Sequence, residues 1–306
     1  MTVGSGDQAR EALAQQLEAA GHQSPSGSLG IYGRSAEFEA VVDGLGKALV
    51  AMEKPDETVD RMFFPPLEPR AAYLKTDYLA SFPQLTGAVD TFTGNDKDHK
   101  ALLKVYEEGG DWADSLVPSG LMMVPATCHN VYPRYSGQIE GNKRVEARSW
   151  CFRHEPEVDP MRMVCFRIYE QVFIGAAEGA QAHRDTWMTN YVNLFGDLGL
   201  EVDTDVANDP FFGRAGRILA VGQKSEALKF EVLTDIYDDK QTAIASGNAH
   251  RTHFGENFGI TLPDGSLAHS SCAGMGMERA TIALLVRHGM DVAAWPADVK
   301  DRLGLA

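Results

Sequence analysis

The chain has 306 residues, 44% of them hydrophobic, so it can bury a large core as one big domain or two modest ones. Its formal charge of −15 disfavours a large nucleic-acid interface, because such binding needs many Lys and Arg side chains against phosphates. Four cysteines do not suggest a disulfide framework at this length, and no apolar run reaches the roughly 18 residues of a membrane span. The first residues lack the basic-then-apolar layout of a secretory signal, so we expect a cytoplasmic protein.

Two amphipathic helices are predicted near the N-terminus. Residues 7–20 place Leu13 and Leu17 at i, i+4 spacing, and Gly21 ends this helix. Residues 36–52 repeat apolar side chains at helical spacing, so the second helix is expected to bury one face. The prolines of the following FFPPLEPR stop the pattern, since proline lacks an amide hydrogen and clashes with the preceding turn. The repeating apolar residues of the second helix are Phe38, Val41, Val42, Leu45, Leu49 and Met52.

The remainder of the chain is typical of strands joined by turns, with helices between and after them. The turn-rich PEVDP joins residues 146–155 to residues 162–175, which predicts an antiparallel hairpin. Hairpin-connected strands with helices around them favour an α+β fold, an antiparallel sheet packed on helices. The expected elements are strands at 115–129, 146–155, 162–175, 229–237 and 258–272, a helix at 182–198, an acidic and then glycine-containing loop at 202–216, and a closing helix from Met277.

The hairpin can present arginines, carboxylates and an aromatic ring on one surface. Side chains alternate between the two faces of a strand, so Arg153 and Glu155 are expected to share a face. On the returning strand Arg162, Phe166 and Glu170 also have one parity. A solvated face with surface salt bridges is one interpretation. The second interpretation is a planar ligand stacked between an aromatic ring and a guanidinium group, and the presence of Phe166 among the arginines favours it.

Two motifs in this order resemble those of class II aminoacyl-tRNA synthetases. FRHE (residues 152–155) followed by RMVCF (162–166) resembles their second signature, and GMGMER (274–279) resembles their third. The helix before FFPPLEPR resembles a divergent first signature, which builds the dimer interface in that class. The resemblance covers about residues 36–290. It implies a class II synthetase-like catalytic domain at 31–306, with an antiparallel sheet flanked by helices, a helix-and-loop appendage at 1–30, and no tRNA-binding domain.

The resemblance also implies roles for single residues. Arg153 would hold the α-phosphate of ATP and the amino-acid carboxylate, and Glu155 would accept a hydrogen bond from the adenine amino group. Phe166 would stack on adenine, Arg279 would close the other face of the ring, and Arg162 would reach the distal phosphates. Arg153 and Arg279 are therefore the expected catalytic residues. The implied ATP-binding set, for ATP with Mg²⁺, is Arg153, Glu155, Arg162, Phe166, Gly274, Gly276 and Arg279. The two glycines would let the backbone pass close to the nucleotide.

A zinc site is expected from Cys128, Glu170 and Cys272. Zinc accepts two thiolates and a carboxylate, and three protein ligands leave a fourth position open for a reactant. The spacing is not that of a zinc finger, and each cysteine taken singly is better explained by packing. The trio, however, resembles the zinc ligands of the methanogen-type seryl-tRNA synthetases and of the amino acid:[carrier protein] ligases, in which the metal would bind the substrate's α-amino group. Cys151 and Cys165 are assigned to packing.

Further candidates come from two loops. Asp209 in NDPFFG is expected to border the amino-acid pocket, together with Ser246 and Asn248 in SGNAHRTHF. The second segment is also a candidate for lining the nucleotide or magnesium site. His129, beside Cys128, is expected to support the site or lie at the surface rather than to bind metal.

The acceptor of the activated amino acid is expected to be small. Only residues 1–35 precede the first long helix, which leaves no room for a tRNA-binding appendage. The resemblance therefore implies that glycine or alanine and ATP give an aminoacyl-adenylate, which the 4′-phosphopantetheine thiol of a carrier protein attacks, in a homodimeric enzyme that needs neither tRNA nor a membrane. Two alternatives remain: a truncated seryl-type tRNA synthetase, and a synthetase-like module that binds without catalysis. Arg214, Arg217 and Lys224 are candidates for docking an acidic carrier.

Overall fold

A computed structural model describes residues 6–209 and 211–305, without the side chains of residues 214–219. Its centre is a seven-stranded sheet in which neighbouring strands are antiparallel, except for the parallel pair β8 and β3 at one edge. The expected α+β class and antiparallel sheet are therefore confirmed. In spatial order the strands are β10 (Val202–Val206), β11 (Lys229–Asp235), β12 (Gln241–Arg251), β14 (His269–Gly276), β9 (Cys165–Gly175), β8 (Lys143–Phe152) and β3 (Asp60–Phe63).

A layer of helices buries one face of this sheet. Helix α2 (Ala36–Ala51) begins at Ser35, whose hydroxyl accepts a hydrogen bond from the Phe38 amide at 3.0 Å. Its predicted apolar stripe is buried, apart from the half-buried Met52. Leu13 and Leu17 join the same core, so the N-terminal helix packs on the body of the protein. The other helices of this layer are α1 (Asp7–Ala19), α6 (Ala177–Asp197), α9 (Met277–His288) and α10 (Ala297–Leu303).

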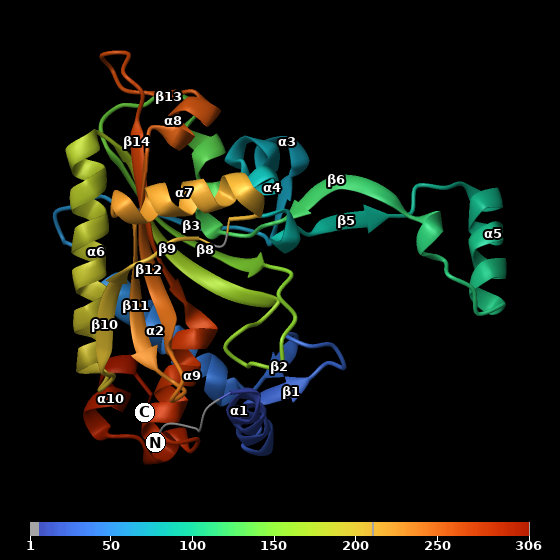
Figure 1. Cartoon of the computed structure of the whole chain (residues 1–306), viewed down its shortest axis with the longest axis horizontal. Coiled ribbons are helices and arrows are strands. Elements are labelled where there is room, and N and C mark those ends of the chain that lie inside the picture. The colour runs from blue at the N-terminus through green and yellow to red at the C-terminus, as the bar shows by residue number, and fades with distance from the viewer. Residues whose placement is uncertain (1–5, 210, 306) are drawn as a thin grey trace.

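The other face of the sheet is covered only in part. Helix α7 (Gly213–Ser225) crosses it, and α8 (His253–Phe258) packs against β12 and β14 (Figure 1). Several short elements complete this side of the body: α3 (Arg70–Tyr73), α4 (Tyr78–Ser81), β7 (Gly137–Gln138), β13 (Ile260–Thr261), and the 3₁₀ turns at 74–76, 83–85, 127–130 and 132–135. At the far end of the body β1 (Gln23–Pro25) pairs with β2 (Tyr32–Arg34).

An arm projects from the body beside β3. It consists of β4 (Leu67–Pro69), β5 (Ala88–Thr91) and β6 (Val117–Met123), with α5 (Asp96–Glu107) at its tip (Figure 1). The Asn95 side chain accepts from the amides of the first turn of α5, and Asp98 accepts from the Asn95 amide, which forms a capping box. Yet no residue of α5 is buried. The sequence analysis predicted only β6 of this arm.

The predicted hairpin is present as β8 and β9, but its ends were placed wrongly. Strand β8 ends at Phe152 and β9 begins at Cys165, so Arg153, Glu155 and Arg162 lie in the connecting loop instead of alternating along strands. The β8–β9 pairing ends because the chain turns at Asp159, whose carboxylate accepts a hydrogen bond from the Met161 amide at 2.9 Å. The Val164 amide then bonds to the Gly30 carbonyl instead of continuing the pair.

Three other expectations were wrong. The loop predicted at 202–216 contains strand β10 and the start of α7, because the acidic residues of VDTDV occupy an edge strand paired only with β11. Strand β12 was missed, since its polar SGNAH segment carries no apolar alternation. Helix α6 starts five residues earlier than its predicted start at 182. Among the described residues, none of the helices has the length and apolar character to cross a membrane.

A buried histidine on α6 gives the fold a pH dependence. Burial lowers the pKa of His183 to about 3, with smaller contributions from Arg144 and Lys54, and its ring faces the Ser271 hydroxyl at 3.3 Å. The unfolded chain therefore binds more protons than the folded chain between pH 6.5 and 3, so stability falls as pH falls through that window. We expect His183→Gln to reduce the loss of unfolding free energy between pH 7 and pH 5 by about 2 kcal/mol. Urea denaturation at both pH values measures this, and equal losses in both proteins would contradict it.

Candidate active site

Strand register places one row of polar side chains on the open face of the sheet. In antiparallel strands directly opposed residues share a face. Gly274 on β14 opposes Glu170 on β9 and Ser246 on β12, and Cys272 opposes Asn248. The row extends to β11, where Lys229 opposes Asn248 and Glu231 opposes Ser246. The sequence analysis missed Lys229 and Glu231, although the alternation in KFE was a signal for them.

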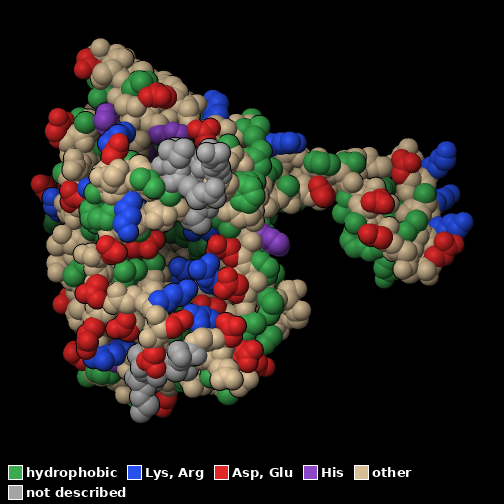
Figure 2. Space-filling view, in the orientation of Figure 1, with side chains coloured by type: hydrophobic (Ala, Val, Ile, Leu, Met, Phe, Trp, Pro, Cys, Tyr) green, Lys and Arg blue, Asp and Glu red, His purple; other side chains and the backbone are tan. Residues whose placement is uncertain are grey.

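This row forms the floor of a cavity of about 920 Å³. Figure 2 shows that the body is hollowed on this face, with Lys and Arg side chains gathered next to Asp and Glu. The walls come from the Arg153 loop, the end of α7, α8 and the base of the arm. All but one of the predicted site residues line the cavity: Cys128, Arg153, Glu155, Phe166, Glu170, Asp209, Ser246, Asn248, Cys272, Gly274, Gly276 and Arg279.

Arg162 is the predicted residue outside this lining. Its guanidinium lies 3.5 Å from Glu155 and 3.6 Å from Glu157, at the mouth of the Arg153 loop. The pairing with Glu155 ties Arg162 to a residue that does line the cavity.

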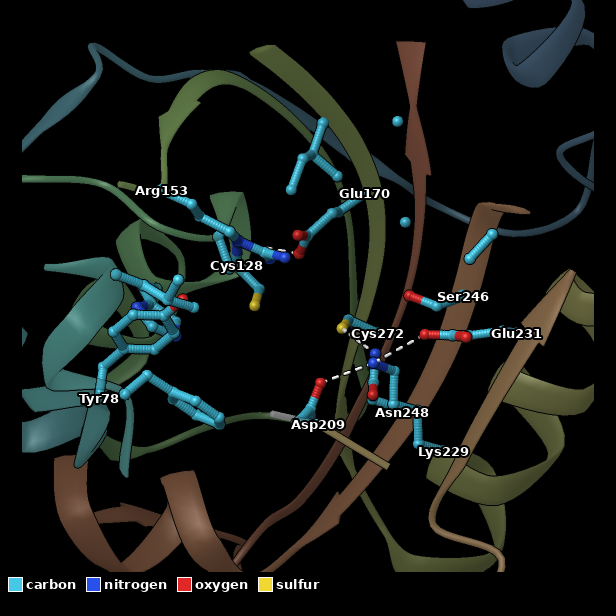
Figure 3. Close-up of a pocket in the computed structure, with 18 of the residues that line it drawn as sticks. Tyr78, Cys128, Arg153, Glu170, Asp209, Lys229, Glu231, Ser246, Asn248 and Cys272 are labelled. Atoms are coloured by element: carbon cyan, nitrogen blue, oxygen red, sulfur yellow. Dashed lines mark hydrogen bonds and ion pairs between the residues drawn. The ribbon is translucent and has the colours of Figure 1, made fainter. Parts of the chain in front are cut away.

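Cys128, Glu170 and Cys272 converge at one end of the cavity. One sulfur or oxygen from each lies within 4.8 Å of the others, and all three side chains are buried (Figure 3). The 3₁₀ turn at 127–130 supplies Cys128, whose amide donates to a Glu170 carboxylate oxygen at 2.9 Å. Hydrogen bonding with Cys272, followed by burial, raises the pKa of the Cys128 thiol, and burial raises the pKa of Glu170.

The donor set suits a divalent cation. Two sulfurs and a carboxylate are ligands that zinc accepts, and three protein ligands match sites that keep a position for a reactant. No Lys or Arg of the described residues forms an ion pair with Glu170, so the thiols and the carboxylate, once ionised, have no cationic side chain paired with them. The residues present therefore fit a zinc ion.

Two polar side chains touch the Cys272 sulfur from β12. Asn248 Nδ2 lies 3.8 Å from it, and His250 Nε2 lies 3.6 Å from it. Burial lowers the pKa of His250 to about 3, so this imidazole is neutral at ordinary pH. His129, next to Cys128, is buried, and its Nδ1 lies 3.8 Å from the carboxylate of the enclosed Glu68. His129 is thus not at the surface, which was one of the two positions expected for it.

The cavity also holds arginines and an aromatic ring, and the Arg153 side chain extends toward Glu170 and Cys128 (Figure 3). The Arg153 guanidinium lies 5.6 Å from the centre of the Phe166 ring, and its Nε donates to the Pro125 carbonyl at 3.0 Å. Burial alone would lower the pKa of Arg153, but Tyr78, Cys151, Asp209 and Glu155 raise it above its ordinary value. A planar group stacked on Phe166 would therefore lie beside a fixed positive charge.

Arg279 projects from the first turn of α9. Its guanidinium donates to the Met161 carbonyl at 2.6 Å and to the Ala243 carbonyl at 3.1 Å. These bonds fix the side chain between the Arg153 loop and β12. Burial, with the nearby charges of Arg162 and Arg153, lowers the pKa of Arg279.

Asp209 belongs to an ion-pair cluster across the cavity from Arg153. Lys229 Nζ lies 2.6 Å from Asp209 Oδ1 and 3.0 Å from Glu231 Oε1, and Gln223 Nε2 donates to Asp209 at 2.7 Å (Figure 3). Burial alone would raise the pKa of Asp209, but Lys229 and Gln223 hold it below its ordinary value. The cluster thus presents an ionised carboxylate to the cavity.

Three aromatic side chains that the sequence did not reveal, from α4 and from the loop before α7, form one wall of the cavity. The rings of Tyr78 and Phe82 lie 4.8 Å apart, and Phe82 stacks on Phe211 at 4.9 Å. Burial raises the pKa of Tyr78 above its ordinary range, which keeps the phenol neutral. Tyr78 and Phe82 have i, i+4 spacing on the single turn of α4, which is too short to give a recognisable pattern, and Phe211 comes from the loop before α7.

Comparisons with known proteins identify the family of the chain. No family model matches the chain. Amino acid–[acyl-carrier-protein] ligase 1 of Bradyrhizobium diazoefficiens is 40% identical over 283 residues, which cover 91% of this chain and 86% of that protein. The chain belongs to the amino acid–[acyl-carrier-protein] ligase family. A second ligase of this family from the same organism is also 40% identical, over 92% of this chain.

Relatives of these ligases include the type-2 serine–tRNA ligases. That of Methanococcus aeolicus is 28% identical over 80% of this chain, which corresponds to 50% of its own length. Among solved structures, M. kandleri SerRS bound to A. aeolicus tRNASec has a TM-score of 0.81 at 19% identity, over 95% of this chain and 60% of that chain. The cytoplasmic serine–tRNA ligase of Naegleria fowleri has a TM-score of 0.71 at 12% identity. These likenesses confirm the class II synthetase fold of this ligase.

Proposed function

We propose that this ligase activates a small amino acid with ATP and transfers it to the 4′-phosphopantetheine thiol of a carrier protein. The observation that carries the proposal is the single cavity in which Cys128, Glu170 and Cys272 face a site containing Arg153 and Phe166. The 40% identical relatives are named for ligation to an acyl carrier protein, which supports the acceptor.

Zinc at the three converging ligands would supply an open coordination position for the substrate amine. Two thiolates and a carboxylate around a dication leave a net charge near −1, so a neutral amine suits that position and a second carboxylate does not. This charge would select amino acids over simple carboxylic acids. Asp209, Ser246 and Asn248 border the same end of the cavity and would shape the space for a small side chain, that of glycine or alanine.

Activation joins the amino-acid carboxylate to the α-phosphorus of ATP and releases pyrophosphate. The chain has to align two anionic groups and offset their charge. Arg153 would contact both groups, Phe166 would stack on adenine, and Glu155 would accept from the adenine amino group; all three line the cavity. Arg279 would cover the other face of adenine, and Arg162 would reach the distal phosphates with Mg²⁺. Gly274 and Gly276 leave the floor below the nucleotide free of side chains.

We propose that the enzyme is a cytoplasmic homodimer and does not use tRNA. The charge of −15 disfavours a phosphate-rich partner. The side chains of Arg214 and Arg217 lie outside the described residues, and Lys224 is exposed in the last turn of α7. Analytical ultracentrifugation tests the dimer, and a monomer at micromolar concentration would contradict it.

Amino-acid-dependent pyrophosphate exchange tests the activation step. We expect exchange with glycine or alanine exceeding that with serine, followed by thioester formation on a phosphopantetheinylated carrier and none on tRNA. Absence of exchange with all three amino acids would contradict both enzymatic functions and favour a non-catalytic binding module. Exchange followed by charging of tRNA alone would favour a truncated seryl-type synthetase.

Gly274→Ala is expected to lower activation about tenfold while the fold persists. A Cβ at Gly274 would lie 3.1 Å from Glu170 Cγ and 3.1 Å from Ile168 Cγ2, so Glu170 would have to move within a buried site. Small displacements at a reacting centre cost up to about 100-fold in rate. Pyrophosphate exchange and bound zinc per chain measure the effect. The matched control is Gly196→Ala on α6, where a Cβ meets nothing within 4 Å, and equal activity of the two variants would contradict the prediction.

A further inference from the structure

A histidine and an aspartate form a pair at the rim of the cavity. His253 is the first residue of α8, and its Nε2 lies 3.6 Å from Asp77 Oδ2. Asn257 places its amide nitrogen 3.4 Å from each of these two atoms. Both members of the pair line the cavity, yet 42% of the His253 side chain and 57% of the Asp77 side chain are exposed. The roles proposed above for the activation step do not involve either residue.

Other titratable and charged groups near this pair come from β12 and from the end of α7. Arg251, at the end of β12, forms an ion pair with Glu226, which follows α7. His250 lies three residues before His253, and the charge of His253 contributes to lowering the pKa of His250. Asp77 and Arg251 both have left-handed backbones, with φ of +56° and +54°. Non-glycine residues seldom adopt this conformation, and such strain clusters at functional sites.

The side chains of the other two histidines that line the cavity already have partners within the protein. His250 directs Nε2 at the Cys272 sulfur and Nδ1 at the hydroxyls of Ser270, 3.1 Å away, and Tyr132, 3.3 Å away. His129 is buried, between the rings of Tyr78 and Phe254 and the Glu68 carboxylate. Among the described lining residues, His253 is therefore the imidazole reached from both solvent and cavity.

The position of His253 is next to the metal-ligand end. Its neighbour Phe254 stacks on Tyr132 at 4.0 Å, and both rings belong to the apolar cluster that contains Cys128 and Cys272. In an aminoacyl group the carbonyl carbon is one atom removed from the carbon that bears the amine. A nucleophile that attacks this carbonyl therefore approaches the end of the cavity at which His253 lies.

We propose that His253, oriented by Asp77, is the general base that takes the proton of the acceptor thiol in the transfer step. The inference rests on the proposed function. As the S–H proton moves to the imidazole, sulfur bonds to the aminoacyl carbonyl carbon, and the bond from that carbon to the phosphate oxygen breaks. AMP leaves with the electron pair, and the imidazolium then returns its proton to solvent. In the tautomer this role requires, Nε2 carries its proton toward the Asp77 carboxylate, to which Asn257 also donates, so Nδ1 takes the proton of the thiol and the carboxylate stabilises the imidazolium.

Measuring activation and transfer as separate half-reactions distinguishes this role from a role in activation. In His253→Gln we expect pyrophosphate exchange within about twofold of wild type. Single-turnover transfer from the enzyme-bound aminoacyl-adenylate to free 4′-phosphopantetheine is expected to fall about 100-fold at pH 7. The deficit should shrink at pH 9.5, because a thiol of pKa about 8.5 ionises there without a base. Asp77→Asn, which keeps a side chain that tolerates the left-handed backbone, is expected to reduce transfer about tenfold.

The matched control is His99→Gln on the exposed helix α5, which should preserve both half-reactions. Transfer by His253→Gln at the wild-type rate, or a deficit that is equal at pH 7 and pH 9.5, would overturn the inference while the proposed function stands. An equal loss of exchange and transfer would also overturn it, because the role would then be structural. A wild-type protein that exchanges pyrophosphate but does not load the thiol would overturn the proposed function and this inference together.

Discussion

Cys272→Ala is expected to release bound zinc and to lower amino-acid-dependent pyrophosphate exchange by more than about 100-fold, since changes outside the ligand set already cost 10–100-fold in metal affinity. Cys272 lies on β14 within 4.8 Å of Cys128 and Glu170, and its removal leaves two ligands where three converge. Metal analysis of the purified protein gives the first readout, and exchange with glycine or alanine gives the second.

Cys165→Ala is the matched control for this experiment. Cys165 starts β9 with the opposite parity to Glu170, is partly exposed and does not line the cavity. The Cys165→Ala protein should keep its bound metal and its pyrophosphate-exchange activity. A folded Cys272→Ala protein that lacks zinc and still activates amino acids at the wild-type rate would refute the metal site. Circular dichroism and a thermal melt establish that each variant is folded.

Arg153→Met is expected to lower pyrophosphate exchange by about 10²–10³, the usual effect of losing one group that stabilises transition-state charge. Arg153 is enclosed in the cavity wall, held by the Pro125 carbonyl and surrounded by acidic groups that keep it charged. Arg153→Lys should rescue little, because an ammonium group cannot hold two anionic groups with the planar fork of a guanidinium. Steady-state exchange at varied ATP and amino acid measures both variants.

Arg302→Met on α10 is the control for the loss of an arginine. Its guanidinium lies 3.7 Å from Asp197 at the far side of the helical layer and does not line the cavity. Exchange should stay within about twofold of wild type, since an exposed ion pair contributes at most about 1 kcal/mol to stability. If Arg153→Met kept the same activity as this control, Arg153 would have no part in activation.

Local patterns determined the elements whose signals lie within one segment. The apolar repeat of 36–52 predicted α2 and its buried face, and PEVDP between two apolar runs predicted the hairpin. GMGMER predicted the junction of β14 and α9 for the same reason. The loop ends of the hairpin were misplaced because Asp159 and Gly30 redirect the chain through contacts that no local pattern encodes.

Local sequence patterns could not predict contacts between residues that are distant in the chain. Lys229 of β11 forms an ion pair with Asp209 of the loop before α7, and Tyr78 faces the site only because the base of the arm folds over the sheet. Residues 202–206 were predicted as a loop because their acidic side chains suit water, and an edge strand exposes them equally well. The exposed helix α5 likewise lacks the burial that makes a helix easy to predict.

The sequence alone therefore determined the kinds of side chain available: two thiols, a carboxylate, the arginines and the phenylalanine of a nucleotide site. It also determined the family to which the chain belongs, since 40% identity extends over 91% of its length. Only the tertiary structure decided that Cys128, Glu170 and Cys272 lie within 4.8 Å of one another and that His253 meets Asp77 at the rim. The physical reason is that both sets join separate segments: strand register puts Glu170 of β9 and Cys272 of β14 on one face, and a shift of one residue would turn each to the opposite face. Cys128, His253 and Asp77 reach their places only because the turn at 127–130, α8 and the segment before α4 pack over that face.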